Sequence, residues 1–332
     1  MKRLLPKEFI AERSFHVEYL DGAQRAQLRA SILGEIHYTP PALAVGAAPG
    51  ASVAMMQLQA TPVVETWLSA TPPRRGSANG FDFAHNDEVM FGVYTQAVDD
   101  ADFETQVQAL YESLRHIARA AGFPHLLRVW NYFPDIARAR AGLDRYKRFC
   151  RARATALASL AAQAHTELPA ASAVGTRGGN LVVYFLAGVA AGRQCENPRQ
   201  VSAYHYPPQY GPRSPSFARA TLTADGRLLI SGTASIVGHE SRHIGDVSAQ
   251  LEETLENLRA LIAAAARDKH AAFTGLEDLR QVKIYLRHAH DYEPVARRLR
   301  TVLHPQAQCL YLLADICREE LLLEIEGVAG RT

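Results

Sequence analysis

The chain has 332 residues, enough for about two domains of ~150 residues each. Hydrophobic and aromatic residues make up 48 % of it and charged residues 21 %, a composition typical of a globular protein with its own buried core. The formal net charge of +2 is too small to indicate a protein that binds nucleic acid through bulk electrostatics.

The cysteines and the apolar stretches indicate the cellular compartment in which the protein is expected to reside. No two cysteines form a CxxC pair, which favours a reducing compartment without a disulfide framework; they are Cys150, Cys195, Cys309 and Cys317. The N-terminus has a basic start but neither a continuous apolar segment nor a cleavage site, so we expect no signal peptide. Apolar stretches such as residues 181–192 are shorter than the ~20 residues of a membrane span. We therefore expect a cytoplasmic protein that contacts no membrane.

The first half of the chain alternates short strands with two helices. A strand is expected within residues 40–62, after a loop rich in Gly, Pro and Ala, and another at 86–97. Residues 102–123 predict a helix that a glycine ends, because apolar side chains recur at helical spacing. A strand up to Pro134 follows, and a long helix is expected from about Leu143.

The second half repeats this rhythm. A strand at residues 181–188 is followed by a hairpin that turns at Asp225 and Gly226. Asp246 is expected to cap a helix with leucines at helical spacing. The chain then closes with a strand, a helix and two strands, at residues 279–288, 292–303, 307–316 and 321–329.

These elements predict an α+β fold of two units, each a mixed sheet with helices packed on one face. A segment rich in Gly and Ala at residues 165–180 is the expected junction between them. We therefore expect an N-terminal domain over residues 1–165 and a C-terminal domain over residues 166–332.

The sharpest short motif is "HESRH", from His239 to His243, which matches the HExxH pattern of zinc proteases. That chemistry needs both histidines on one face of a helix. Glycines at 238 and 245 flank the motif, and a helix this short between glycines is poorly formed. A loop that joins a strand to a helix is therefore favoured over a zinc site, and we expect no metal.

The helix after Leu143 carries an arginine on its apolar side. Tyr146, Phe149, Cys150 and Arg153 follow the spacing i, i+3, i+4, i+7. An arginine buried on that face needs an anionic partner, which is either a carboxylate of the protein or one of a substrate.

A long Pro-rich and aromatic segment, residues 196–220, is a candidate binding loop, with a surface loop as the alternative. Its Tyr206, Arg213 and Arg219 suit a small ligand that bears carboxylates. Just after it, Gly232 and Ala234 in "SGTASIVG" are candidates for a pocket floor against which a small ring lies, or for a close approach of backbone.

Near the C-terminus, "LLLEIE" alternates as a strand does, which places Glu324 and Glu326 on the same face. Either this face is exposed to solvent, as in many antiparallel sheets, or one of the acids lines a site. For Cys317, the ordinary reading is a buried and inert thiol.

Several of these stretches, in order from about Arg128 to Gly327, resemble the chorismatase family. They read "RVWNYFPDI", "GLDRYKRFCRARA", "ENPRQVSAYHYPPQYGPRSPSFARA", "ISGTASIVGHESRHIGDVSAQLEETLENL" and "DICREELLLEIEG". Part of the C-terminal half also resembles the Rid (YjgF-type) family. The resemblance implies two Rid-like, or chorismate-mutase-like, units with a catalytic C-terminal domain, and an enzyme that releases pyruvate from chorismate.

The resemblance also implies roles for single residues. Glu324 matches the glutamate of the last strand that is the family's general acid. Cys317, seven residues earlier, and Gly232 match the branch of the family that forms 3-hydroxybenzoate. The chain is also similar to a xanthomonad relative that is associated with both 3- and 4-hydroxybenzoate. Because seven is an odd offset, a straight strand would put Cys317 and Glu324 on opposite faces, so we expect "CREE" to form the turn of a hairpin.

The expected ligands and alternatives follow from the same residues. Arg153 and Arg219 are first choices for the two carboxylates of chorismate, with Tyr206 and Arg213 as further contacts. No cofactor and no nucleic acid are expected, and the oligomeric state stays open. Three other functions remain: a chorismate hydrolase that forms a dihydroxy-cyclohexadiene carboxylate, an imine deaminase of the Rid type, and a binding protein for small ligands.

Overall fold

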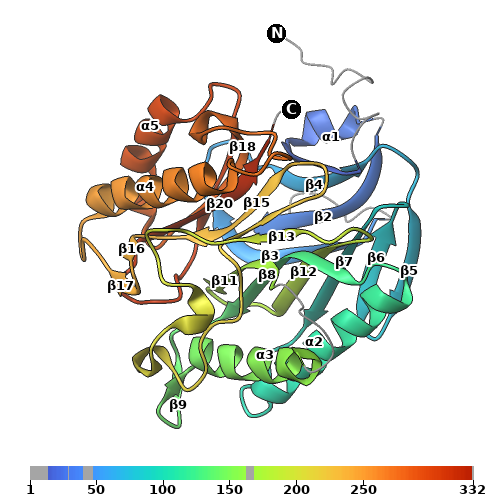
Figure 1. The fold of residues 1–332 in the computed structure, drawn as a ribbon, viewed down its shortest axis with the longest axis horizontal. Helices are drawn as coiled ribbons and strands as arrows, with labels where there is room; N and C mark the ends of the chain where they lie inside the picture. Colours follow the sequence, from blue (N-terminus) through green and yellow to red (C-terminus); the bar gives the residue numbers. More distant parts are fainter. Residues whose placement is uncertain (1–13, 29, 40–47, 162–167, 331–332) are drawn as a thin grey trace.

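The computed structural model has four layers, with two stacked β-sheets between two pairs of helices (Figure 1). Helices α4 (Val247–Ala265) and α5 (Tyr292–Val302) cover one outer face, and α2 (Phe103–Ala120) and α3 (Arg145–Ala161) cover the other. The predicted α+β class, with helices on one face of each sheet, is confirmed. The structure describes residues 14–28, 30–39, 48–161 and 168–330.

The larger sheet has ten strands, in the order β1-β4-β2-β3-β19-β18-β20-β15-β14-β13. It joins both ends of the chain, because β3 lies beside β19. Its strands are β1 (His16–Leu20), β2 (Ser31–Thr39), β3 (Gly50–Gln57), β4 (Val64–Ser69), β13 (Arg193–Cys195), β14 (Ala220–Leu222), β15 (Leu228–Thr233), β18 (Leu279–Leu286), β19 (Gln308–Leu313) and β20 (Leu323–Ala329).

The smaller sheet has six strands, in the order β11-β8-β12-β7-β6-β5. These are β5 (Arg74–Ala78), β6 (Phe81–His85), β7 (Val89–Gln96), β8 (His125–Pro134), β11 (Ala170–Thr176) and β12 (Leu181–Gly188). The short elements elsewhere are α1 (Gly22–Ala26), β9 (Ala139–Arg140), β10 (Leu143–Asp144), β16 (Ile236–Val237) and β17 (Glu240–Ser241).

The inner faces of the two sheets pack against each other through large aromatic side chains. Trp130 and Tyr184 stack with their ring centroids 4.5 Å apart, and Trp67 meets Trp130 edge to face at 5.2 Å. The outer faces bury aliphatic side chains under the helices, such as Leu255 and Leu258 of α4. Each strand therefore contributes alternate residues to two different apolar layers, which leaves polar residues of the inner faces fully enclosed.

Most of the predicted elements are present at nearly the predicted positions. The helix within residues 102–123 ends at a glycine whose φ is +90°, a conformation that favours glycine. The hairpin between β14 and β15 turns at Asp225 and Gly226, and Gly226 has a φ of +83°. Asp246 caps α4, because its side chain accepts a hydrogen bond from the N–H of Ala249 at 3.0 Å.

The boundary between the two predicted domains, at residues 165 and 166, lies outside the described residues and stays a prediction. Both sheets take strands from both sides of it. Strands β1 to β4 belong to the ten-stranded sheet, and β11 and β12 belong to the six-stranded one. No helix in the described part of the chain combines the length and the apolar character that crossing a membrane requires.

Candidate active site

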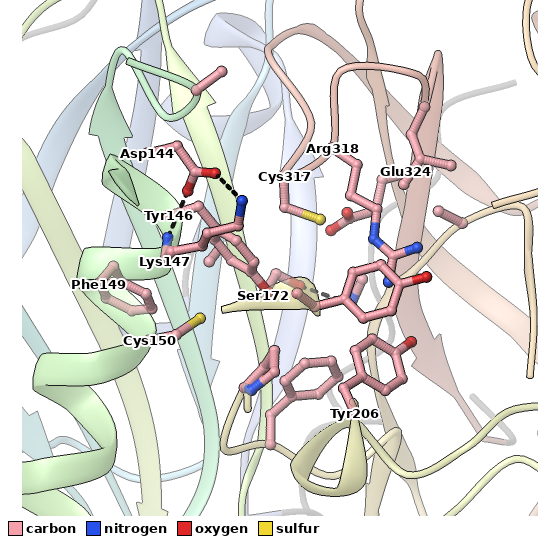
Figure 2. A pocket seen from close by; sticks show the side chains of 18 of the residues that line it. Asp144, Tyr146, Lys147, Phe149, Cys150, Ser172, Tyr206, Cys317, Arg318 and Glu324 are labelled. Carbon is pink, nitrogen blue, oxygen red and sulfur yellow. Dashed lines mark hydrogen bonds and ion pairs between the residues drawn. The ribbon is translucent and has the colours of Figure 1, made fainter. Parts of the chain in front are cut away.

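A cavity of about 480 Å³ opens between α3, the start of β11, the loop before β14, and the segment that leads into β20 (Figure 2). Most of the residues singled out from the sequence line it. These are Arg153, Tyr206, Arg219, Gly232, Ala234, Cys317 and Glu324. Arg213, in contrast, is exposed and does not line this cavity. The fold therefore brings residues from 153 to 324 to one place.

Glu324 lies on β20 with only 5 % of its surface exposed. Its neighbours Leu323 and Ile325 point to the opposite face, into the apolar layer under the helices, as the alternation predicted. Burial raises the pKa of the Glu324 carboxyl to about 8, and the charge of Glu326 adds to this, while Arg128 and Arg219 oppose it. Glu324 therefore holds its proton at neutral pH, as a general acid must.

Gly232 makes room for this carboxyl group. The pairing of β15 with β20 shifts register between Ile230 and Thr233, which is a bulge that brings Gly232 against β20. A Cβ atom at position 232 would lie 1.8 Å from Oε1 of Glu324, far inside the contact distance. Only a glycine permits the observed position of the Glu324 carboxyl group.

Cys317 is half-buried in the segment between β19 and β20, and its thiol faces the same cavity as Glu324 (Figure 2). Burial raises the pKa of this thiol to about 12, and the charge of Glu324 adds to the shift. Cys317 is therefore a protonated thiol at neutral pH rather than a nucleophilic thiolate.

The chain turns directly after Cys317, since the N–H of Leu321 bonds the carbonyl of Arg318 at 3.2 Å. The turn that the odd offset predicted is thus confirmed. The predicted hairpin is wrong, because β18 lies between β19 and β20 in the sheet. Strand β19 runs parallel to β18 while β20 runs antiparallel to it, so the turn carries the chain across β18.

Arg153 is 3 % exposed on the buried side of α3, as its spacing predicted. Its guanidinium lies 5.0 Å from the centre of the Tyr111 ring. Neither Nε nor Nη2 has a hydrogen-bond partner, and no carboxylate among the described residues forms an ion pair with it. Because a buried cation needs an anion, this arrangement points to a carboxylate that enters the cavity with a ligand.

Arg219 and Tyr206 form a second polar group on the wall of the cavity. Nη2 of Arg219 donates to the Tyr206 hydroxyl at 2.8 Å and to the carbonyl of Val201 at 3.0 Å. The Nε atom of Arg219 is buried and has no partner in the described structure. This arginine is held in place by the protein and keeps one donor for a ligand.

The structure adds wall residues that the motifs did not single out. The guanidinium of Arg318 lies 4.0 Å from the centre of the Tyr210 ring, and its Nη1 donates to the carbonyl of His239 at 2.9 Å. Tyr146 and Cys150 of α3 line the cavity one helical turn apart. The sequence could have predicted Tyr146 and Cys150 as wall residues, because they share a helical face with Arg153. For Arg318 the sequence offered only its position next to Cys317.

The "HESRH" segment is not helical. Its residues lie in and around the small hairpin of β16 and β17, so the two histidines lack the spacing of a zinc helix. His239 packs against Tyr210, at 5.6 Å between ring centres. Within the described chain, no three His, Cys, Asp or Glu side chains are grouped so as to hold a metal ion.

Comparison with known proteins finds relatives over most of the chain. Residues 65–187 match the family model described as chorismatase FkbO/Hyg5-like, N-terminal. A 3-hydroxybenzoate synthase from Streptomyces hygroscopicus is 37 % identical over 321 residues, which are 90 % of this chain and 91 % of that protein. The chain belongs to the chorismatase family. A chorismatase from Streptomyces rapamycinicus is 38 % identical over 80 % of the present chain and 82 % of its own length.

The fold of this chorismatase family member is also that of a solved chorismatase. A crystal structure of a chorismatase covers 96 % of this chain and 98 % of the other, with a TM-score of 0.87 and 32 % identity. RidA from the Antarctic bacterium Psychrobacter sp. PAMC 21119 covers 42 % of the chain at 18 % identity, with a TM-score of 0.33.

Proposed function

We propose that this chorismatase converts chorismate to 3-hydroxybenzoate and pyruvate, with Glu324 as the general acid. The observation that carries the proposal is that a protonated, buried carboxyl group and two arginines with unpaired guanidinium nitrogens line the same cavity. Chorismate is a dianion with two carboxylates and an enolpyruvyl ether. Arg153 and Arg219 bind the carboxylates, and Glu324 acts on the ether.

The reaction begins with transfer of the Glu324 proton to the terminal methylene carbon of the enol ether. This makes a methyl group and an oxocarbenium ion, and leaves Glu324 ionised. Carbon is a weak base, so the acid needs close placement and a proton retained at neutral pH. The burial of Glu324 against Gly232 supports both conditions.

In the second step, the ring hydroxyl displaces the ether oxygen from the adjacent ring carbon. The bond between that carbon and the ether oxygen breaks, pyruvate leaves with the electron pair, and the hydroxyl proton passes to the ionised Glu324 as an arene oxide forms. Opening of the oxide and loss of a ring proton give the aromatic product. Together 3-hydroxybenzoate and pyruvate contain all the atoms of chorismate, so no water is consumed. Opening in the other direction gives 4-hydroxybenzoate as a second product.

The alternative in the same cavity is hydrolysis, in which water adds to the oxocarbenium ion and the dihydroxy-cyclohexadiene carboxylate is released with pyruvate. Gly232 and the thiol of Cys317 favour the aromatic product, because they match the branch that forms it. A ligand-binding protein would account for the unpaired arginine nitrogens but gives no role to the protonated glutamate, and a Rid-type imine deaminase gives none to the loop of Tyr206 and Arg219.

The purified protein, incubated with chorismate, tests the proposal. Pyruvate should appear in amounts equal to the chorismate consumed, and chromatography should show 3-hydroxybenzoate as the main aromatic product. Chorismate that stays intact would refute the function. Pyruvate with mainly the dihydrodiol would refute the product while keeping the family chemistry.

Replacement of Arg153 by methionine should raise KM for chorismate by about 10- to 100-fold, because one charge-assisted contact to a carboxylate is lost. Steady-state kinetics of pyruvate release measure this. Arg151→Met is the matched control, since Arg151 lies on the same helix but pairs with Glu104 at 2.7 Å and is half exposed. An unchanged KM in Arg153→Met would remove this arginine from the binding site.

Replacement of Cys317 by alanine should shift the product from 3-hydroxybenzoate toward the dihydrodiol, since Cys317 lines the cavity of Glu324 and, by the family resemblance, takes part in the branch that forms 3-hydroxybenzoate. The product ratio is measured by chromatography at full conversion. Cys309→Ala serves as the control, because Cys309 lies on β19 in the apolar layer under the helices. A Cys317→Ala enzyme that forms only 3-hydroxybenzoate at the normal rate would refute this role.

A further inference from the structure

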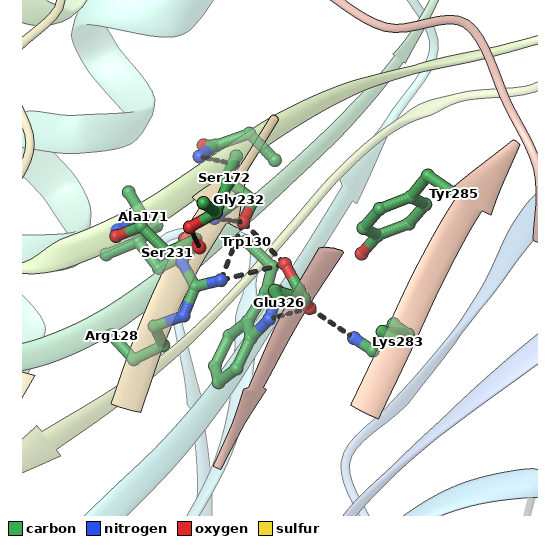
Figure 3. A network of polar contacts seen from close by, with 12 residues as sticks. Arg128, Trp130, Ala171, Ser172, Ser231, Gly232, Lys283, Tyr285 and Glu326 are labelled. Atoms are coloured by element: carbon green, nitrogen blue, oxygen red, sulfur yellow. Dashed lines mark hydrogen bonds and ion pairs between the residues drawn. The ribbon is translucent and has the colours of Figure 1, made fainter. Parts of the chain in front are cut away.

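A cluster of paired charges is buried between the two sheets, next to the active site (Figure 3). Arg128 of β8, Glu65 of β4, and Lys283 and Glu326 of the C-terminal strands are each at most 3 % exposed. Burial of four charged groups is costly, and apolar side chains would fill the same space at lower cost. The reaction proposed above does not yet use any of them.

Glu326 has both carboxylate oxygens fully engaged. Oε2 accepts from Nη2 of Arg128 at 2.8 Å and from the hydroxyl of Ser172. Oε1 accepts from Nε1 of Trp130 at 2.7 Å and pairs with Nζ of Lys283 at 3.0 Å. Arginine, tryptophan and lysine can only donate at these atoms.

The Ser172 hydroxyl can only donate to Glu326 as well. Its oxygen already accepts from Nη2 of Arg128 at 2.6 Å and from the backbone N–H of Gly232 at 2.8 Å. The single hydroxyl hydrogen is thus left for Oε2 of Glu326. With four donors and no acceptor around it, Glu326 has no place for a proton and is an ionised carboxylate.

This fixed negative charge lies two residues from Glu324, on the same face of β20, about 7 Å along the strand. The other groups that face Glu324 come from several elements. They are Arg128 of β8, Arg219 before β14, Tyr146 of α3 and the thiol of Cys317. The two arginines favour an ionised Glu324, whereas its burial and the charge of Glu326 oppose ionisation.

We propose that Glu326 is a positioning residue, a permanent anion that keeps the proton on Glu324. The hydroxyl group of Ser172 links Glu326 by hydrogen bonds to Gly232, the glycine against which the Glu324 carboxyl group packs. This inference rests on the proposed function. It gives a role to three of the four buried charges. Arg128 and Lys283 keep Glu326 ionised, and Glu326 in turn prevents the cations around the cavity from drawing the proton off the acid.

The test is the pH dependence of kcat/KM for pyruvate release in Glu326→Gln. Wild-type activity should fall as pH rises through about 8, where Glu324 loses its proton. Removal of a like charge at about 7 Å should move this alkaline limb down by about one pH unit. At pH 6, where Glu324 is protonated in both enzymes, the rates should be close.

Glu65→Gln is the matched control. Glu65 pairs with the same lysine, at 2.9 Å between Oε2 and Nζ, and accepts from Tyr38 at 2.6 Å, but it lies on β4, whereas Glu326 shares β20 with Glu324. The Glu65→Gln variant loses a buried carboxylate of the same cluster, with a similar cost in stability. The alkaline limb of its kcat/KM profile should stay at the wild-type pH. An equal shift in both variants would show a general disturbance of the cluster and overturn the proposal.

If Glu326→Gln fails to fold, the double variant Glu326→Gln/Lys283→Met removes an anion and a cation together, which a buried site tolerates better. Its alkaline limb should move in the same direction by a smaller amount. A folded variant with an unshifted limb would overturn the role of Glu326. A wild-type enzyme that releases no pyruvate would instead refute the proposed function, so the two failures are distinct.

Discussion

Replacement of Glu324 by glutamine is expected to lower kcat for pyruvate release by about 10²- to 10⁴-fold, with little change in KM. Glutamine fills the same space against Gly232 and still forms hydrogen bonds, but it has no acidic proton to give to carbon. Steady-state kinetics with chorismate measure both constants. The loss should appear in kcat because the proton moves only in the transition state.

Glu319→Gln is the control for this change, since Glu319 is an exposed carboxylate at the same cavity. It should retain nearly full activity. Full activity in Glu324→Gln would contradict the assignment of the acid, and so would equal losses in the two variants.

The same substitution should change the pH dependence of stability. Wild-type Glu324 has a pKa of about 8 when folded against an ordinary value of 4.5, so the folded state holds a proton that the unfolded state has lost between these values. The free energy of unfolding therefore falls by about 1.4 kcal/mol for each pH unit in this window. Glutamine does not titrate, so Glu324→Gln should gain stability relative to wild type from pH 5 to pH 8, as measured by denaturant unfolding.

Replacement of Gly232 by alanine is expected to have the second largest effect. The new Cβ would lie 1.8 Å from Oε1 of Glu324, so the carboxyl group must move away. Because Oε1 is the end of a flexible side chain, the fold should survive while the acid is displaced from its position beside the substrate. We expect a rate about 10- to 100-fold lower, since catalytic groups tolerate little misplacement.

The products of Gly232→Ala should also change. The family resemblance implies alanine at this position in the branch that forms the dihydrodiol, and a displaced carboxyl group leaves space at the oxocarbenium ion for water. Chromatography of the aromatic and dihydroaromatic products measures the ratio. An unchanged rate and an unchanged ratio together would show that the contact between Gly232 and Glu324 has no part in catalysis.

Local sequence patterns were enough to predict much of this site. The alternation of "LLLEIE" placed Glu324 on the face opposite Leu323, and the helical spacing after Tyr146 placed Arg153 on a buried side. The odd offset between Cys317 and Glu324 required a turn, which is present. Such patterns depend on the period of one strand or one helix, and the rest of the chain does not alter them.

Other features depend on partners far along the chain. Alternation puts Glu324 and Glu326 on one face and cannot separate them. Their difference arises from Arg128, Ser172 and Lys283, which come from three other strands and direct their ion pairs and hydrogen bonds to Glu326. The addition of β1–β4 to the sheet of the C-terminal half likewise leaves no local signal. Nor does loop composition tell that Arg219 faces inward while Arg213 is exposed.

The contact between β3 and β19 has a consequence for synthesis of the protein. The N–H of Tyr311 bonds Oε1 of Gln59 across a separation of 252 residues, and Leu312 and Leu313 pair with the end of β3. During synthesis on the ribosome, the edge of β3 therefore stays unpaired until almost the entire chain has been made and β19 has emerged. An unpaired strand edge is a site of aggregation, so the nascent chain has a long period of risk. Slow folding and a need for chaperones during expression are the expected results of such a distant pairing.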